Sequence, residues 1–224
     1  MRVLIADDDA YVRRGLKDII LEEYSDAEIA EARNAREAIN MVREHWRAQF
    51  WDVMVLDISM PGGSGIEVLK ELKKDYRKLP ILVLSGHSED EYAVRTLKAG
   101  ASGYLTKETA PEELIAAIRK VLAGGKYISA AVAEKLVLDL ENAADKPPHE
   151  NLSDREYQIM CMIAAGREVG EIASELSLSI KTISTYRARI LEKMRMSTNA
   201  QLTFYAIKNS LVDERQVERG KEKG

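Results

Sequence analysis

The chain has 224 residues, 46% hydrophobic and 31% charged, so it can bury an ordinary core and is long enough for two domains. Its one cysteine, Cys161, excludes an internal disulfide framework and fits a reducing compartment. No basic leader and no apolar stretch of membrane-spanning length is visible, so we expect a cytoplasmic protein with no membrane partner.

The net charge of −4 hides a difference between the two halves of the chain. Residues 1–150 carry 21 basic and 27 acidic residues, whereas residues 151–224 carry 12 and 10. Within Ile180–Lys208, six basic residues stand against one acidic residue, Glu192. A polyanion would contact a basic stripe of this kind.

Up to about residue 123, short apolar runs alternate with amphipathic helix patterns. The predicted strands are Val3–Ala6, Glu28–Ala32, Val53–Asp57, Ile81–Ser85 and Gly103–Thr106. The helices between and after them are expected at 11–23, 35–46, 66–74, 90–99 and 112–122, three of them starting at the capping boxes Ser64…Glu67, Ser88…Glu91 and Thr109…Glu112. Five such units predict a doubly wound parallel sheet of order 2-1-3-4-5, because right-handed crossovers must cover both faces.

Acidic residues follow two strands that are neighbours in this order. Asp7 and Asp8 follow the first strand, and Asp57 ends the third. The carboxyl ends of parallel strands meet at one edge, so these carboxylates should converge, and a hard divalent cation would relieve their repulsion. We therefore expect Mg²⁺ bound by Asp7, Asp8, Asp57 and the backbone carbonyl of Ser59. For each acid taken alone, a helix cap or a solvated turn is the plainer alternative.

Two more polar residues stand at the ends of the remaining central strands. Ser85 ends the fourth strand and Lys107 follows the fifth. A hydroxyl can donate to a phosphoryl oxygen, and an ammonium can offset its charge. A carboxylate such as Asp57 can act as a nucleophile toward a phosphoryl group when a cation neutralises the oxygens. The set favours phosphoryl transfer to Asp57.

The first half resembles the receiver domain of two-component response regulators from residue 2 to about 123. The resemblance rests on Asp7-Asp8, Asp57 with Met60-Pro61-Gly62, Ser85, and Tyr104 followed by Lys107. It implies that Asp57 accepts a phosphoryl group from a sensor histidine kinase. It also implies that Asp8 is the main side-chain ligand of Mg²⁺ and that Asp7 acts through water.

The same resemblance gives Ser85 and Lys107 the phosphate contacts and makes Tyr104 an aromatic switch. Asp9 adds a further negative charge beside the acid pair, and Gly86 stands where alanine is common in the family. These two departures put the rate of dephosphorylation in doubt, but not the site.

The chain between the two domains is predicted to hold one helix and a linker. Gly124-Gly125 ends the first domain, Ala130–Glu141 is a further helix, and Asn142–Asn151 contains two prolines that bar a continued helix. The predicted division is a receiver domain at 1–124, a linker helix and flexible linker at 125–150, a second domain at 151–212 and a charged tail at 213–224. Ser153…Glu156 is a capping box for the first helix of the second domain, expected at 157–165.

The second domain has helix-turn-helix order. A short helix at Glu171–Leu176 and a turn at Ser177-Leu178 precede Ser179, which caps a helix that ends near Met194. Apolar residues of that helix recur at core spacing, and a solvated face is the alternative for its other side. Small and polar side chains there can approach base edges while basic ones reach phosphates. The residues expected to contact DNA are Lys181, Thr182, Ser184, Thr185, Arg187, Ala188, Arg189 and Lys193.

This half is similar to the LuxR/FixJ-type DNA-binding domain, and the order of domains to the NarL/FixJ response regulators. The similarity rests on Leu152-Ser-Asp-Arg-Glu156, Glu171-Ile-Ala173, Ser179-Ile-Lys-Thr-Ile183 and Ile190-Leu-Glu-Lys-Met194. Tyr186 stands where the family usually has histidine. The resemblance implies an all-α domain that binds double-stranded DNA, a homodimer when phosphorylated with a dimer contact at Asn199–Lys208, and contact with RNA polymerase as a further partner.

Three rival functions are weaker. A magnesium-dependent phosphohydrolase would need an acid two residues beyond Asp57, where Ser59 stands. RNA readers favour aromatic platforms or grooves for single strands over a helix-turn-helix. Pro61-Gly-Gly-Ser-Gly65 lacks the spacing of a dinucleotide-binding loop and does not follow the first strand. The sequence therefore predicts a phosphorylation-controlled transcription factor and not an enzyme.

Overall fold

The computed structural model describes residues 1–45, 51–60, 64–86, 90–109, 111–141, 147–209 and 211–212. The chain divides into two compact units, Met1–Lys135 and Leu136–Gly224, and each is described separately below. Among the described residues, no helix combines the length and the apolar character that crossing a bilayer requires.

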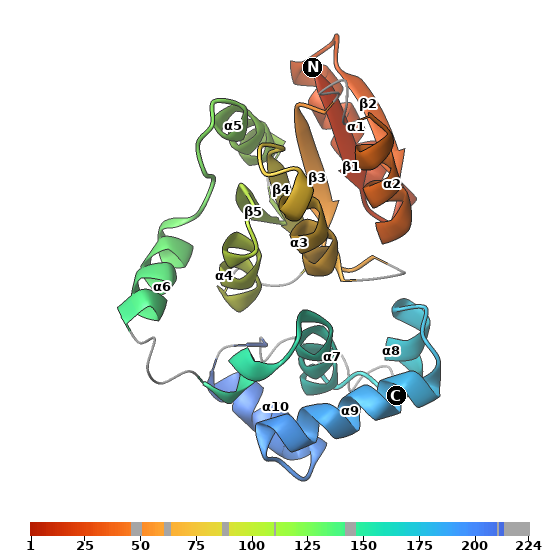
Figure 1. Cartoon of the computed structure of the whole chain (residues 1–224), viewed down its shortest axis with the longest axis vertical. Helices are drawn as coiled ribbons and strands as arrows, with labels where there is room; N and C mark the ends of the chain where they lie inside the picture. The colour runs from red at the N-terminus through yellow and green to blue at the C-terminus, as the bar shows by residue number, and fades with distance from the viewer. Residues whose placement is uncertain are drawn as a thin grey trace. The chain divides into compact units, whose positions relative to one another are not determined.

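The first unit is a five-stranded parallel sheet with helices on both faces (Figure 1). The strand order is β2-β1-β3-β4-β5, which confirms the predicted topology. The strands are β1 (Arg2–Ala6), β2 (Glu28–Ala32), β3 (Val53–Asp57), β4 (Ile81–Ser85) and β5 (Gly103–Thr106). Four of them have the predicted bounds, and β1 begins one residue earlier because Arg2 pairs in register with Glu28.

The helices of this unit lie within two residues of their predicted bounds wherever the structure describes both. They are α1 (Ala10–Glu23), α2 (Ala35–His45), α3 (Gly65–Asp75), α4 (Asp90–Lys98) and α5 (Pro111–Leu122), and α6 (Ala130–Glu141) spans the division between the two units. The capping box of Ser64 and Glu67 is confirmed, while Ser88 lies outside the described residues. Asp9 has a role that the sequence did not reveal, since its side chain accepts the Tyr11 and Val12 amides and caps α1.

Burial explains why the central strands read as unbroken apolar runs. Every residue of β3 and β4 is buried, whereas β2 at the sheet edge is mostly exposed or half-buried. One side of the sheet packs its alternate residues against α1 and α5, with Leu16, Ile20 and Ile118 in this core. The strands therefore deliver the residues at their carboxyl ends to one rigid edge.

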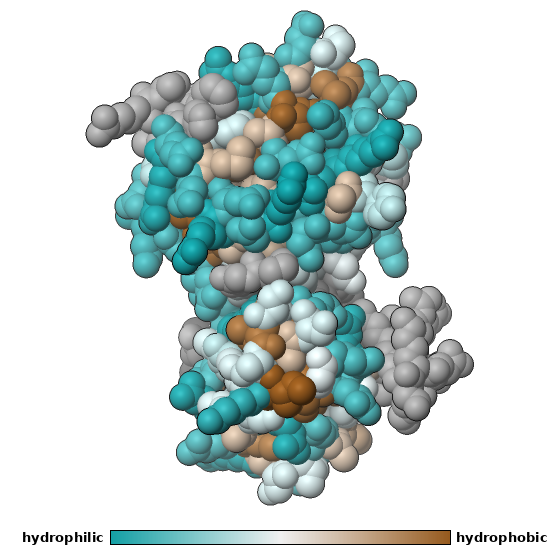
Figure 2. Space-filling model, turned by 90° about the vertical axis from the view of Figure 1, so that its right-hand side faces the viewer, coloured by the Kyte–Doolittle hydropathy of each residue, from teal (hydrophilic) through white to brown (hydrophobic). Residues whose placement is uncertain are grey.

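The second unit is helical. Its elements are the 3₁₀ helix η2 (Pro148–Asn151) and the helices α7 (Asp154–Ala164), α8 (Val169–Glu175), α9 (Ile180–Met194) and α10 (Asn199–Lys208). Ile183, Ile190 and Met194 are buried on α9, as their spacing predicted. Ser153 and Thr198 cap α7 and α10 with complete capping boxes. In Figure 2, hydrophilic side chains cover most of the first unit on the face shown, whereas neutral and apolar side chains gather at the centre of the face of the second unit.

One prediction about the linker is wrong. Pro148–Asn151 forms a 3₁₀ helix, and His149 is only 4% exposed. Its Nδ1 lies 2.6 Å from the Tyr205 hydroxyl on α10. Proline bars the interior of a helix but suits its first turn, where a backbone N–H would have no acceptor within the helix and its absence costs nothing. The flexible part of the predicted linker at 142–146 and the charged tail at 213–224 lie outside the described residues.

Candidate functional site

The three predicted acids meet at the carboxyl edge of the sheet. Oxygens of Asp7, Asp8 and Asp57 all lie within 4.8 Å of one another. The β1–β3 register sets Ala6 beside Leu56, so the residues that follow face each other across adjacent strands. Asp7 and Asp57 are each 1% exposed, whereas Asp8 is exposed. The cluster thus has a buried floor and one acid at the solvent side.

Lys107 places its ammonium on this floor. The Nζ atom lies 2.8 Å from Oδ2 of Asp7 and 3.1 Å from Oδ2 of Asp57. Its backbone amide donates to the Ser85 carbonyl at 2.7 Å, which fixes the turn after β5 against the end of β4. One cation therefore contacts two buried carboxylates that come from two other strands.

The electrostatics of the cluster favour a further cation. Burial and then the Asp7 charge raise the pKa of Asp57 to about 6, although Lys107 and the Ser59 amide act in the opposite direction. Burial also raises the pKa of Asp8. Burial alone would lower the pKa of Lys107, but Asp57 and Asp7 outweigh it and raise the value. The acids remain in excess of the positive charge that the site supplies.

The donor set fits a hard cation. Carboxylate and carbonyl oxygens are the ligands that Mg²⁺ prefers, and the three acids offer them within one small region. Asp57 Oδ1 already accepts the Ser59 amide at 3.1 Å, so this loop is held close to the acid. Ser85 and Tyr104 lie buried on the neighbouring strands β4 and β5. Pro61 and Gly62 of the motif lie outside the described residues.

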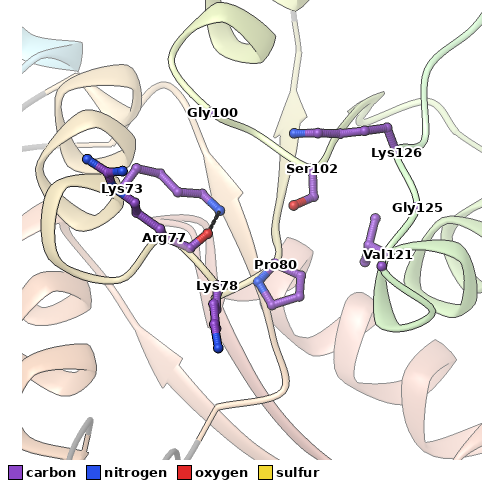
Figure 3. A pocket seen from close by; sticks show the side chains of 10 residues that line it. Lys73, Arg77, Lys78, Pro80, Gly100, Ser102, Val121, Gly125 and Lys126 are labelled. Atoms are coloured by element: carbon purple, nitrogen blue, oxygen red, sulfur yellow. Dashed lines mark hydrogen bonds between the residues drawn. The ribbon is translucent and has the colours of Figure 1, made fainter.

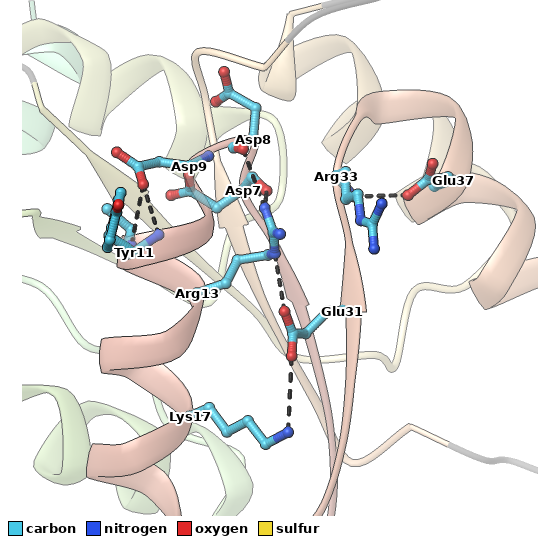
Figure 4. A network of polar contacts seen from close by, with 10 residues as sticks. Asp7, Asp8, Asp9, Tyr11, Arg13, Lys17, Glu31, Arg33 and Glu37 are labelled. Carbon is cyan, nitrogen blue, oxygen red and sulfur yellow. Dashed lines mark hydrogen bonds and ion pairs between the residues drawn. The ribbon is translucent and has the colours of Figure 1, made fainter.

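A buried arginine that the sequence reasoning missed holds the acidic loop in place (Figure 4). Arg13 on α1 is 6% exposed, and its Nη1 donates to the backbone carbonyls of Asp7 and Asp8 at 2.8 and 3.1 Å. Its Nε pairs with Glu31 on β2 at 3.0 Å, and Lys17 approaches the other oxygen of that glutamate at 3.8 Å. The only hint in the sequence is a charged residue between the core positions of α1.

A glycine permits the close approach of α3 to the end of β3. A Cβ atom at Gly65 would lie 2.3 Å from the carbonyl oxygen of Asp57 and 2.6 Å from the Cα atom of Ile58. The Gly65 amide donates to the Ile58 carbonyl at 2.9 Å. Any side chain at this position would displace the backbone that carries Asp57.

On α9, the structure separates the predicted DNA contacts into two groups. Lys181, Ser184, Thr185, Ala188, Arg189 and Lys193 are exposed, whereas Thr182 and Arg187 are half-buried. The Thr182 hydroxyl lies 2.7 Å from that of Ser179, and Arg187 donates to Asn199 at 2.7 Å. The Thr185 hydroxyl donates to the Lys181 carbonyl at 2.9 Å. Lys193 pairs with Glu156 of α7 at 2.6 Å.

The pair of Lys193 and Glu156 links α9 to the capping box of α7. Burial raises the pKa of Glu156, but hydrogen bonds from Lys193 and Ser153 outweigh it and the net effect lowers the pKa. Helical spacing cannot reveal this contact, since the partners are 37 residues apart. The structure therefore gives Lys193 a structural contact as well as its place on the basic stripe.

A doubly wound α/β unit with a cluster of acids at the carboxyl edge of its sheet, followed by a helix-turn-helix unit, is the organisation of a response regulator. Family comparisons agree: residues 3–119 match the response regulator receiver domain, and residues 150–206 match the bacterial regulatory proteins of the luxR family. The chain belongs to the two-component response regulators that join these two domains, the NarL/FixJ family. This is a family of transcription regulators and not of enzymes, which sets the phosphohydrolase alternative aside.

Two curated relatives match almost the whole chain. The response regulator UvrY of Escherichia coli O6:H1 is 35% identical over 212 residues, covering 94% of this chain and 95% of the relative. The response regulator GacA of Pseudomonas protegens is 35% identical over 213 residues, covering 95% and 98%. The likeness therefore extends over both domains and the segment between them.

Solved structures show the same fold. RcsB from Salmonella enterica serovar Typhimurium, bound to the promoter rprA in the presence of the phosphomimetic BeF3−, matches with a TM-score of 0.58. The two are 26% identical, with 92% of this chain and 97% of that chain covered. A LuxR-family two-component response regulator from Aurantimonas sp. SI85-9A1 matches with a TM-score of 0.55 and 32% identity, covering 63% and 98%.

Proposed function

We propose that this response regulator accepts a phosphoryl group on Asp57 from a sensor histidine kinase and, when phosphorylated, binds operator DNA as a dimer through α9. The observation that supports the first step best is the position of Asp57. It is a buried carboxylate at the end of a central strand, with Asp7, Asp8 and Lys107 around it. A regulator of this kind would act in the cytoplasm, where its DNA lies.

The transfer itself needs a nucleophile and charge neutralisation. An oxygen of Asp57 attacks the phosphorus, the bond from phosphorus to the kinase histidine breaks, and an acyl phosphate forms. Mg²⁺ would be held by Asp8, Asp57 and the carbonyl of Ser59, with Asp7 acting through water, and it would neutralise charge on the phosphoryl oxygens. Lys107 stands close enough to Asp57 to bind one of those oxygens, and the Ser85 hydroxyl can bind another.

Recognition of DNA is assigned to the exposed face of α9. Ser184, Thr185 and Ala188 are small or polar and exposed, so they can approach base edges in a major groove. Lys181 and Arg189 flank them and can reach phosphates. The RcsB structure named above holds promoter DNA, which supports the same role for this domain here. A promoter-bound regulator of this kind can also contact RNA polymerase.

Phosphorylation would act on DNA binding through dimer formation. Ser85 can move toward the new phosphoryl oxygens, and Tyr104 can enter the space that it leaves, which reshapes the surface from β4 to α5. A dimer would place two α9 helices about one DNA turn apart, near 34 Å, on an inverted repeat. Coupling of about 1–3 kcal/mol would raise the affinity for the operator roughly 5–150-fold. The alternative is that the unphosphorylated receiver masks α9 and phosphorylation releases it.

The test combines labelling and sedimentation of the full chain. With Mg²⁺ and a small phosphodonor, the protein should take up stoichiometric label, become dimeric and bind its operator more tightly, and Asp57→Asn should do none of these. Label retained in Asp57→Asn would refute the assignment of the acceptor. A labelled chain that binds the operator tightly while remaining monomeric would refute the dimer mechanism and favour release from masking.

A further inference from the structure

A basic hollow lies at the opposite edge of the sheet from the acids. It is lined at the amino ends of β4 and β5 by Pro80 and Ser102, and at the carboxyl ends of α3 and α5 by Lys73 and Val121 (Figure 3). Its volume is about 420 Å³, which is in the usual range of small-molecule sites. Gly100, Gly124 and Gly125 leave much of its wall without side chains.

Among the residues that the structure describes, four cations and no acidic residue line this hollow. They are Lys73, Arg77, Lys78 and Lys126. In the part of the chain that the structure describes, no ion pair joins any of them to a carboxylate. Arg2, Arg43 and Arg119, in the same unit, each pair with a glutamate. Four cations without counter-ions are unexpected in the half of the chain whose net charge is negative.

Hydrogen bonds to the backbone hold two of the ammonium groups at the hollow. Lys73 donates to the Leu79 and Arg77 carbonyls at 2.6 and 3.4 Å, and Lys126 donates to the Ala101 carbonyl. An ammonium has three donors, so one donor remains on Lys73 and two remain on Lys126. Figure 3 shows the Ser102 side chain between them. Its oxygen accepts the Ile81 amide at 3.3 Å, which leaves the hydroxyl proton free to be donated.

The surroundings of Lys73 make the charged form of its side chain less favourable. Burial, followed by repulsion from Lys126, lowers the pKa of Lys73 to about 8. Burial also lowers the pKa of Lys126. A lysine in the last turn of α3 can be explained by the favourable interaction of a cation with the carboxyl end of a helix. That role explains neither the presence of Arg77 and Lys78 nor the lack of an acid among the described residues that line the hollow, whereas a bound anion would account for both.

We propose that this hollow binds a small, multiply charged anion of the phosphate class, either free diphosphate or the diphosphate group of a nucleotide. Ammonium and guanidinium groups are the usual protein ligands of phosphate oxygens, and Arg77 can contribute a bidentate contact. The site is distinct from the acidic edge, which repels anions in the absence of a metal. A ligand here would contact the loops before β4 and β5, the two strands that carry Ser85 and Lys107 at their other ends.

The experiment is a calorimetric titration of the full chain with sodium diphosphate in metal-free buffer at pH 7 and low salt. The double variant Lys73→Met/Lys126→Met should weaken binding at least about tenfold, since it removes two charges that face the ligand. The matched control, Lys70→Met/Lys74→Met, removes the same charge from exposed positions on α3 outside the hollow and should bind as the wild type does. Arg77→Gln, at an exposed position, should weaken binding severalfold even if the double variant fails to fold.

Two further titrations identify which anion is the ligand and test whether diphosphate binds at α9 instead. Adenosine diphosphate that binds more tightly than diphosphate would identify a nucleotide as the ligand, and equal affinity would identify the free anion. Lys181→Met/Arg189→Met removes charge from α9 and should leave diphosphate binding unchanged. The proposal is overturned by no binding at millimolar diphosphate, by binding that survives Lys73→Met/Lys126→Met or Arg77→Gln, or by binding that is lost only with the α9 charges.

Discussion

Replacing the buried acid Asp57 with asparagine should stabilise the first unit when no metal is present. Asp57 is 1% exposed and lies beside the charge of Asp7. The rise in its pKa from 3.8 to about 6 means that its charged form is less favourable in the folded than in the unfolded chain. Asparagine is nearly isosteric, can still accept the Ser59 amide, and carries no charge to bury.

The pKa sets the size and the pH window of the effect. The rise from 3.8 to about 6 corresponds to about 3 kcal/mol at neutral pH, so we expect Asp57→Asn to raise the free energy of unfolding by about 1–3 kcal/mol. Between these two pH values the folded wild type binds more protons than the unfolded chain, so its stability falls as the pH rises. The advantage of the variant is therefore complete above about pH 6 and vanishes below about pH 4.

Urea denaturation followed by tryptophan fluorescence measures the free energy of unfolding of the first unit of the chain. Both tryptophans, Trp46 and Trp51, belong to the first half of the chain, and Trp51 is 7% exposed. The comparison is made in chelator at pH 7.5 and pH 5, with Asp18→Asn as a control at an exposed position on α1. Excess Mg²⁺ should narrow the difference, because a cation that binds the folded wild type stabilises it by mass action.

A variant that is no more stable than the wild type at pH 7.5 in chelator would refute the reasoning. It would mean that Lys107 compensates the buried charge of Asp57 completely. A gain in stability of the same size at pH 5 and pH 7.5 would also contradict it, because the gain would then not come from the charge.

Four other substitutions test the acidic loop and α9. Asp8→Asn should weaken Mg²⁺ binding roughly tenfold by calorimetry, because a charged oxygen ligand is lost, and unchanged affinity would remove its metal role. Arg13→Met removes the donors to the carbonyls of Asp7 and Asp8, so it should weaken Mg²⁺ binding roughly 10-fold while circular dichroism shows an intact fold. If the role of Arg13 is purely structural, the variant will lower the free energy of unfolding and leave Mg²⁺ affinity unchanged. Arg189→Ala should reduce the slope of log affinity for DNA against log salt concentration by about one. Lys193→Met should reduce this slope less, because Lys193 is already paired with Glu156. Equal reductions by the two variants would show that the pair of Lys193 and Glu156 opens on DNA.

Local patterns in the sequence determined the fold and the place of the acidic site. The continuous apolar runs of β3 and β4, the capping boxes at Ser64 and Ser153, and the core spacing on α9 each depend on residues close together in the chain. The strand order followed from the rule for crossovers, and it brought the ends of β1 and β3 together. Residue type and position at the end of a strand were therefore enough to predict which acids converge.

Contacts between distant residues were decided only by the tertiary structure. Arg13 reaches the carbonyls of the acidic loop and Glu31, Lys193 turns to Glu156, and His149 docks on α10. The hollow around Lys73 is recognisable only when the cations of α3, of the loop after it and of the loop after α5 are seen together, with no acid among the described lining residues. Helical and strand periodicity specifies the face on which a side chain lies, but it does not specify which group from another element meets it there. Pairing, burial and the resulting pKa shifts depend on that second element, so they appear only after the chain has folded.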